Sequence, residues 1–68
     1  MRDFRKHLGR EVSVMTSDNT VQGTLEVVGQ HSLTIKPTAL FFSDGQPSET
    51  PKGLIVVDRW SISLVQVL

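Results

Sequence analysis

The sequence predicts a mainly β protein in which five short antiparallel strands bend strongly into a small barrel. Three observations support this fold class: short runs that alternate apolar and polar residues, the turn residues Asp18 and Asn19 between the first two runs, and Gly23 inside the second run. A glycine inside a strand packs against nothing, so it usually marks a bulge or a sharp bend. We therefore interpret Gly23 as a corner of the barrel.

The N-terminal residues predict a short α-helix over about residues 3–8, with Asp3 as its N-cap and Gly9 as its left-handed end. Phe4 and Leu8 are four residues apart and would share one face of this helix. A helix this short is not stable by itself. We expect Phe4 and Leu8 to hold it in place by packing on the barrel.

Residues 12–15, 20–27 and 32–36 predict the first three strands, because their apolar side chains recur at every second position. In the third strand, Leu33 and Ile35 would point inward. The apolar positions expected on one face of the second strand are Val21, Gly23, Leu25 and Val27.

Residues 37–53 predict a long loop between the third and fourth strands. This segment holds all three prolines of the chain and the polar run 43–50. A loop of this length in so small a domain is often functional or disordered. Residues 38–42 leave two alternatives open, since they could extend the third strand or fold over the mouth of the barrel. We expect Phe41 and Phe42 to anchor the loop against the barrel.

The C-terminal part predicts two further strands. Residues 54–57 form a continuous apolar run, which is typical of a strand buried on both faces. Residues 58–61 predict a tight polar turn, in which Asp58 could pair with Arg59. The last strand has two apolar faces, with Ile62 and Leu64 on one and Val65 and Val67 on the other.

The length of 68 residues predicts a single domain over residues 1–68, and domains this short are marginally stable alone. The absence of cysteine excludes disulfides and thiolate zinc sites. His7 and His31 are too few for an ordinary protein-only metal cage, so we expect no metal and no cofactor. Self-association is the remaining way to stabilise such a chain.

No apolar run approaches the roughly 20 residues that span a bilayer, and the N-terminus lacks the apolar region of a signal peptide. We therefore expect a cytoplasmic protein with no membrane partner. No carboxylate pair has a spacing typical of acid–base catalysis, and no glycine-rich phosphate loop occurs. These absences favour a protein that is not an enzyme.

The net charge is zero, which argues against a strongly basic nucleic-acid-binding protein. The charge is unevenly distributed, because residues 1–10 carry four basic residues against Asp3 and so have a net charge of +3. Any anion-binding face should therefore come from this segment. Its basic residues are Arg2, Arg5, Lys6 and Arg10.

The expected helix is followed by strands, and this part of the chain contains Leu8-Gly9, Asp18-Asn19, the Val21–Leu25 stretch and Ser32–Ile35. This pattern resembles the first motif of the Sm/LSm family, including its Hfq branch. The stretch Ile55–Ile62 occupies the place of the second motif. The resemblance implies an Sm-like barrel, related in shape to SH3-like and OB-like barrels. It also implies a homo-oligomeric ring, a hexamer or heptamer, that binds single-stranded RNA. The chain would be a divergent member of phage or prokaryotic origin.

The residues at the family's RNA-binding positions differ in this chain. The family places an Asp and an Asn before the third strand, where this chain has Gln30, His31 and Ser32. Asp58 and Arg59 stand where the second motif has Arg-Gly. The candidate RNA-binding residues are Gln30, His31, Ser32 and Arg59 near the ring pore, and Arg2, Arg5 and Lys6 on the helix. For Trp60 we favour packing near an interface over base stacking.

An edge strand as apolar as residues 62–68 would template aggregation unless something covers it. We expect it to pair with the fourth strand of a neighbouring copy and so to close the ring. An alternative function is a ring-shaped scaffold that has lost RNA binding, which the altered pocket and the neutral charge favour. The expected interface residues are Val56, Ile62, Leu64, Val65 and Val67.

Overall fold

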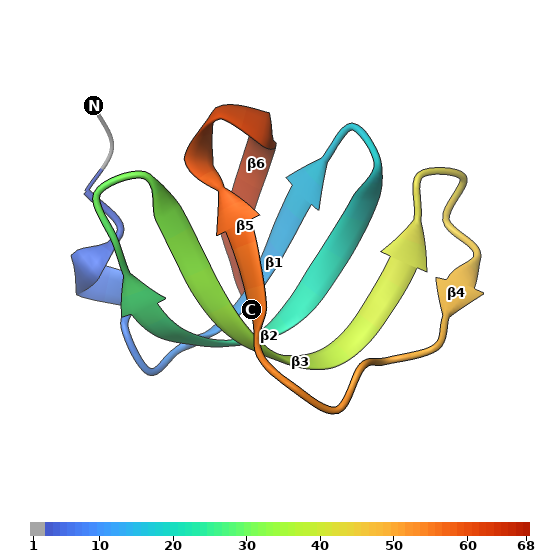
Figure 1. Ribbon diagram of the computed structural model, residues 1–68, viewed down its shortest axis with the longest axis horizontal. Coiled ribbons are helices and arrows are strands. Elements are labelled where there is room, and N and C mark those ends of the chain that lie inside the picture. Colours follow the sequence, from blue (N-terminus) through green and yellow to red (C-terminus); the bar gives the residue numbers. More distant parts are fainter. Residues whose placement is uncertain (1–2) are drawn as a thin grey trace.

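The structure is a computed structural model that describes residues 3–68 (Figure 1). Its described residues form one antiparallel sheet in the order β4-β3-β2-β1-β6, and β5 also pairs with β3. The elements, in chain order, are η1 (Arg5–His7), β1 (Glu11–Thr16), β2 (Asn19–Val28), β3 (Ser32–Phe42), β4 (Pro47–Ser48), β5 (Ile55–Asp58), η2 (Arg59–Ser61) and β6 (Ile62–Val67).

The mainly β, antiparallel class predicted from the sequence is confirmed, but the sheet has six strands and is not closed. The long strands β2 and β3 curve strongly (Figure 1). Within residues 3–68, β5 pairs only with β3 and β6 pairs only with β1. The short 3-10 turn η2 joins β5 to β6. No helix of the described part is long and apolar enough to cross a membrane.

Gly23 lies where the backbone of β3 comes close to that of β2. It pairs with Pro37, and the register shifts between Gln22 and Gly23 so that Thr38 is left over. A Cβ atom on Gly23 would lie 2.8 Å from both the carbonyl carbon of Lys36 and the Cα of Pro37. No side chain fits there. The bulge also lets a strand tolerate Pro37, because prolines in sheets are confined to edges and bulges.

The predicted loop over residues 37–53 is wrong in its extent. The third strand continues through Phe42, and β4 pairs back onto it, with Leu40 opposite Ser48 and Phe41 opposite Pro47. Gly45 makes the tight turn possible with a φ of +89°, and its N–H donates to the carbonyl of Phe42 at 2.9 Å. Of the two alternatives for residues 38–42, the structure contains the extended strand.

The predicted α-helix over residues 3–8 is also wrong. The segment forms a single 3-10 turn, η1, and the Asp3 carboxylate accepts the N–H of Arg5 at 3.0 Å. A 3-10 turn has about three residues per turn, so residues four apart no longer share a face. Phe4 is therefore buried, whereas Leu8 is 47% exposed and does not anchor the segment.

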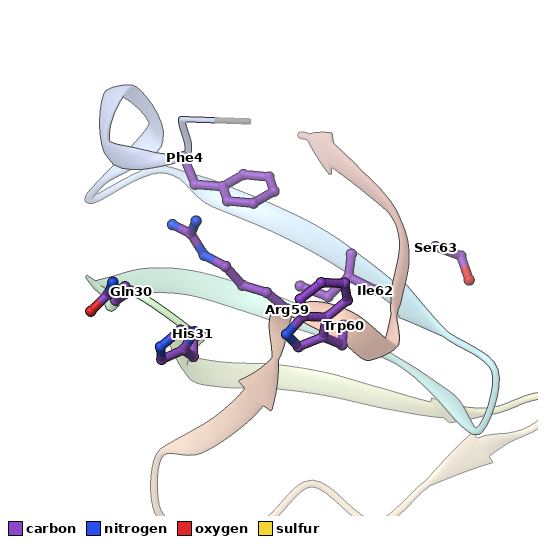
Figure 2. A pocket seen from close by; sticks show the side chains of 7 residues that line it. All are labelled: Phe4, Gln30, His31, Arg59, Trp60, Ile62 and Ser63. Carbon is purple, nitrogen blue, oxygen red and sulfur yellow. The ribbon is translucent and has the colours of Figure 1, made fainter. Parts of the chain in front are cut away.

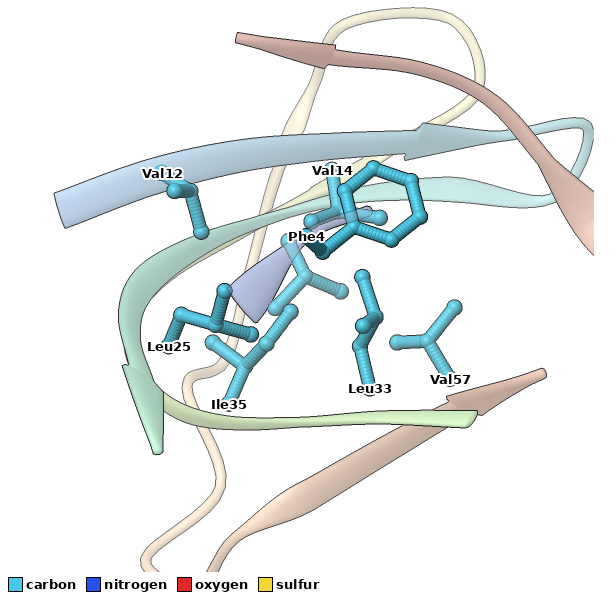
Figure 3. Packing of buried hydrophobic residues seen from close by; sticks show 8 residues of the cluster. Phe4, Val12, Val14, Leu25, Leu33, Ile35 and Val57 are labelled. Carbon is cyan, nitrogen blue, oxygen red and sulfur yellow. The ribbon is translucent and has the colours of Figure 1, made fainter. Parts of the chain in front are cut away.

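The core fills the concave side of the bent sheet, where the buried side chains of different strands meet (Figure 3). Strands β1, β2 and β3 supply most of it, and Val57 of β5 and Phe4 complete it. The core residues are Phe4, Val12, Val14, Val21, Leu25, Leu33, Ile35 and Val57.

Two β-bulges change the faces that simple alternation predicts. An extra residue at Glu26 shifts the register between Leu25 and Val27, so Val27 is 53% exposed instead of sharing the inner face. In β6, Ser63 is the extra residue, because Met15 pairs with Leu64 and Thr16 pairs with Ile62. Ile62 therefore packs against the core while Leu64 is exposed, and the prediction that these two share a face is wrong.

Strand β5 is covered on one face only, so the expectation that residues 54–57 are buried on both faces is wrong. Val57 is buried, but Val56 is 66% exposed and Leu54 is also exposed. The pairing of β5 with the first half of β3 turns Val57 toward the core, and Val56 then faces outward.

Candidate functional site

A groove of about 480 Å³ lies where the β2–β3 loop, η2 and the N-terminal segment meet (Figure 2). Three of its lining residues carry aromatic rings or an imidazole, and one carries a guanidinium. The lining residues are Phe4, Gln30, His31, Arg59, Trp60, Ile62 and Ser63.

Backbone hydrogen bonds hold the two loops of the groove in place. The N–H of Arg59 donates to the carbonyl of His31 at 2.9 Å, which ties η2 to the β2–β3 loop. That loop is closed by the N–H of Gly29, which donates to the carbonyl of Ser32 at 2.8 Å. The walls of the groove are therefore joined by main-chain contacts rather than by side chains alone.

Asp58 caps η2 and does not pair with Arg59, contrary to the expectation for this turn. Its carboxylate accepts the N–H of Trp60 at 3.2 Å, and its carbonyl accepts the hydroxyl of Ser61 at 2.8 Å. Residues such as Asp are preferred at this position because their side-chain oxygens satisfy N–H groups that the turn leaves free. The cap directs Arg59 away from Asp58 and into the groove (Figure 2).

The Arg59 guanidinium packs over the ring of Phe4, with 5.1 Å between Cζ and the ring centroid. A cation at this distance is attracted to the π face of the ring. The Nε atom of Arg59 is buried, and it has no hydrogen-bond partner within residues 3–68. A ligand in the groove cannot reach this buried atom, so the Nη atoms are the donors that the guanidinium offers there.

Trp60 is the most exposed large hydrophobic residue of the described chain, at 88%. Its indole does not pack within this single chain, so packing at an interface stays a prediction. His31 and Gln30 are exposed beside it on the opposite loop. The groove thus offers an open aromatic surface next to a partly buried cation.

The structure brings three predicted site residues together in the groove: Gln30, His31 and Arg59. Ser32 does not line it, because Ser32 begins β3 and pairs with Asp58. Arg2 lies outside the described residues. Phe4 was predicted as a packing residue only, and no local signal in the sequence indicates that it also supports Arg59.

Arg5 is engaged by Asp3, whereas Lys6 is exposed. The Nε and Nη2 atoms of Arg5 donate to the Asp3 carboxylate at 3.0 and 3.3 Å. The side-chain hydrogen bond from Arg5, followed by its backbone N–H, lowers the pKa of Asp3 from 3.8 to about 2. Arg5 is therefore a weaker candidate for binding an anion than Lys6.

This pair predicts a measurable titration. A carboxyl group with a lowered pKa stabilises the folded state above pH 3.8, and this contribution is lost as the pH falls toward 2. We expect the Asp3 carboxyl carbon to titrate with a midpoint of about 2 by NMR. In an Arg5→Gln variant the midpoint should return toward 3.8. A midpoint near 3.8 in the unaltered chain would contradict the ion pair.

The residues expected at the oligomer interface divide into two groups. Val56, Leu64 and Val67 are exposed, at 66%, 40% and 38%. Ile62 and Val65 pack against the core instead. The exposed members lie on β5 and β6, which each have a free edge within residues 3–68, as the two-residue strand β4 also does.

Comparison of the chain with family models, with curated proteins and with solved structures returns no match. Within residues 3–68, no three His, Cys, Asp or Glu side chains are placed to hold a metal ion. The chemistry of the groove is therefore the basis for the function proposed below.

Proposed function

We propose that this protein is a divergent Sm-like protein that binds single-stranded RNA, without covalent chemistry, in the groove between its two loops. The observation that carries the proposal is the exposed Trp60 indole beside a guanidinium that Phe4 holds in place. The proposal therefore assigns Trp60 to base stacking instead of the interface packing that the sequence favours. Proteins bind unpaired bases by stacking them on aromatic rings and by hydrogen bonding to their edges. Arg59, Gln30 and His31 supply such hydrogen-bonding groups within the same groove.

The charge distribution favours an unpaired strand over a duplex. Duplex binding depends on many phosphate contacts, and this chain has no net charge. A stacking site needs fewer cations, because the base supplies much of the binding energy. Lys6 on η1 is exposed near Phe4 and can neutralise a neighbouring phosphate.

We also propose the Sm-like ring as the assembled form. Support comes from the bend at Gly23, from the meeting of the β2–β3 loop with the turn before the last strand, and from the free edges of β5 and β6. Pairing of β6 with β5 of a neighbour would cover Leu64 and Val56 and remove both edges. Native mass spectrometry should then give a hexamer or heptamer. A monomer at micromolar concentration would contradict the ring.

RNA binding is tested by fluorescence anisotropy with labelled oligo-U and oligo-A of about seven nucleotides, at about 50 and about 200 mM salt. Trp60→Ala should weaken binding about tenfold, because stacking on one aromatic ring contributes roughly 1–3 kcal/mol per base. Trp60 is almost fully exposed, so its removal should leave the fold intact.

Two further variants form a matched pair, because each removes one positive charge. Arg59→Gln removes the cation of the groove, whereas Lys52→Gln removes an exposed cation that does not line it. We expect a large loss of affinity only for Arg59→Gln. Equal losses would indicate nonspecific attraction to charge rather than a site.

A ring-shaped scaffold is the second candidate function. It is favoured by the neutral net charge and by the engagement of Arg5 with Asp3. The same titration, extended to an RNA of the same length that contains guanine, separates the two, because a scaffold would bind none of these RNAs at low salt.

A further inference from the structure

We propose that the groove selects guanine among the RNA bases, with the Arg59 guanidinium donating two hydrogen bonds to O6 and N7 while Trp60 stacks on the base. This inference rests on the proposed function, because it names the base that the same groove takes. Both side chains line the groove, and they come from adjacent positions of η2.

The side chains of the groove offer more donors than acceptors. The Arg59 guanidinium and the Trp60 indole N–H can only donate, and none of the described lining residues is acidic. Gln30 and Ser63 combine a donor with an acceptor. A base that satisfies Arg59 must therefore present two acceptors side by side.

Guanine presents such a pair, because its O6 and N7 atoms are both acceptors on one edge. Adenine has an amino donor in place of O6, and cytosine presents an amino donor on the corresponding edge. Unpaired cytosine also has two adjacent acceptors, O2 and N3, on its Watson–Crick edge, so cytosine is the competitor that the test below must separate from guanine. Uracil presents the single acceptor O4 there, since its neighbouring position carries only carbon. Two hydrogen bonds from Arg to O6 and N7 are the commonest specific contact between a side chain and a base. Unpaired bases in RNA leave this edge accessible.

Arg59 is held in a fixed position, as a directional contact requires. Its Cζ lies 5.1 Å from the centroid of the Phe4 ring, and its buried Nε has no partner within residues 3–68. Figure 2 shows the guanidinium between the Phe4 ring and the side chains of Gln30 and His31. A bound base cannot reach the buried Nε, so the two Nη groups would donate to its O6 and N7 atoms.

Trp60 and the size of the groove favour a purine. The indole is 88% exposed, so a base can stack on it without displacing another side chain. A purine covers more of the indole than a pyrimidine does, because it has two fused rings. The groove volume of about 480 Å³ falls within the roughly 300–1,000 Å³ that is typical of small-molecule sites.

The test uses short labelled RNAs in which uridines flank one central base. The central base is guanine, adenine, cytosine, uracil, hypoxanthine or 7-deazaguanine. All probes carry the same phosphates, so a site that recognises phosphate alone would bind them equally. Binding is measured by fluorescence anisotropy of the labelled RNA with the full chain at fixed salt.

We expect guanine to bind about tenfold more tightly than adenine. Hypoxanthine retains O6 and N7, so it should bind nearly as tightly as guanine, while 7-deazaguanine lacks N7 and should bind as weakly as adenine. Arg59→Lys keeps the charge but loses the two-pronged donor, so it should abolish the preference for guanine. Lys52→Gln should keep it. Circular dichroism of each variant reports whether its β structure is folded.

Equal affinity for every central base would overturn the selection of guanine and leave RNA binding intact. Tight binding to guanine together with weak binding to hypoxanthine would also overturn it, because the amino group of guanine would then be the recognised feature. Failure to bind any probe would overturn both this inference and the proposed function.

Discussion

Gly23→Ala is expected to destabilise the protein by about 3 kcal/mol, because the new methyl group would overlap the backbone of β3. The nearest atoms are the carbonyl group of Lys36 and the Cα of Pro37, and backbone atoms cannot rotate away as a side chain can. Strands β2 and β3 must move apart at the bend to remove this overlap. For a domain of this size, the melting temperature should fall by about 15 °C.

Gly53→Ala is the matched control for this prediction. It is the same chemical change at a glycine where a Cβ meets nothing within 4 Å and where φ is not positive. We expect no loss of stability, or a gain of about 0.5 kcal/mol, because alanine reduces the freedom of the unfolded chain. Thermal unfolding of both variants by circular dichroism gives the comparison. Equal melting temperatures would contradict the close approach at Gly23.

Phe4→Ala is expected to cost about 3 kcal/mol of stability and to weaken binding in the groove as well. Phe4 belongs to the buried core, and its ring also carries the Arg59 guanidinium. Truncation leaves a cavity under η1 and removes the support of Arg59. Denaturant unfolding measures the first effect, and RNA anisotropy measures the second.

Two other substitutions separate the roles of the Phe4 ring. Phe4→Leu keeps most of the apolar volume but removes the π face that contacts Arg59. We expect loss of this contact to lower the free energy of unfolding by about 1 kcal/mol. Leu8→Ala changes an exposed apolar side chain just after the same turn, and we expect a cost below about 0.5 kcal/mol. A large cost for Leu8→Ala would favour the α-helix expected from the sequence.

The alternation in the third strand predicts that Leu33 and Ile35 point inward, and both are buried. The same rule fails for Val27, which a bulge leaves exposed. Alternation along one strand does not predict where the bulges occur. A residue such as Ser63 becomes an extra residue only because β6 is aligned with β1, and that alignment depends on contacts far away in the chain. The predicted loop begins at Pro37 because proline usually ends a strand. The strand continues through Pro37 because a bulge beside it makes proline tolerable there.

The candidate site was predictable in part. Gln30, His31 and Arg59 were identified from the two loops, and the structure places them in one groove. The role of Phe4 depends on the path of the first residues, which form a 3-10 turn instead of the expected α-helix. Local propensity does not separate these two conformations in so short a segment, since tertiary packing decides the outcome.

The hydrogen bond from the N–H of Arg59 to the carbonyl of His31 fixes the two walls of the groove before any ligand arrives. The conformational entropy of these loops is then lost during folding, so it does not count against binding. A preorganised groove should admit its ligand without a slow closing step. Its frame is set by the alignment of β3 with β5, because the pairing of Ser32 with Asp58 places His31 next to Arg59.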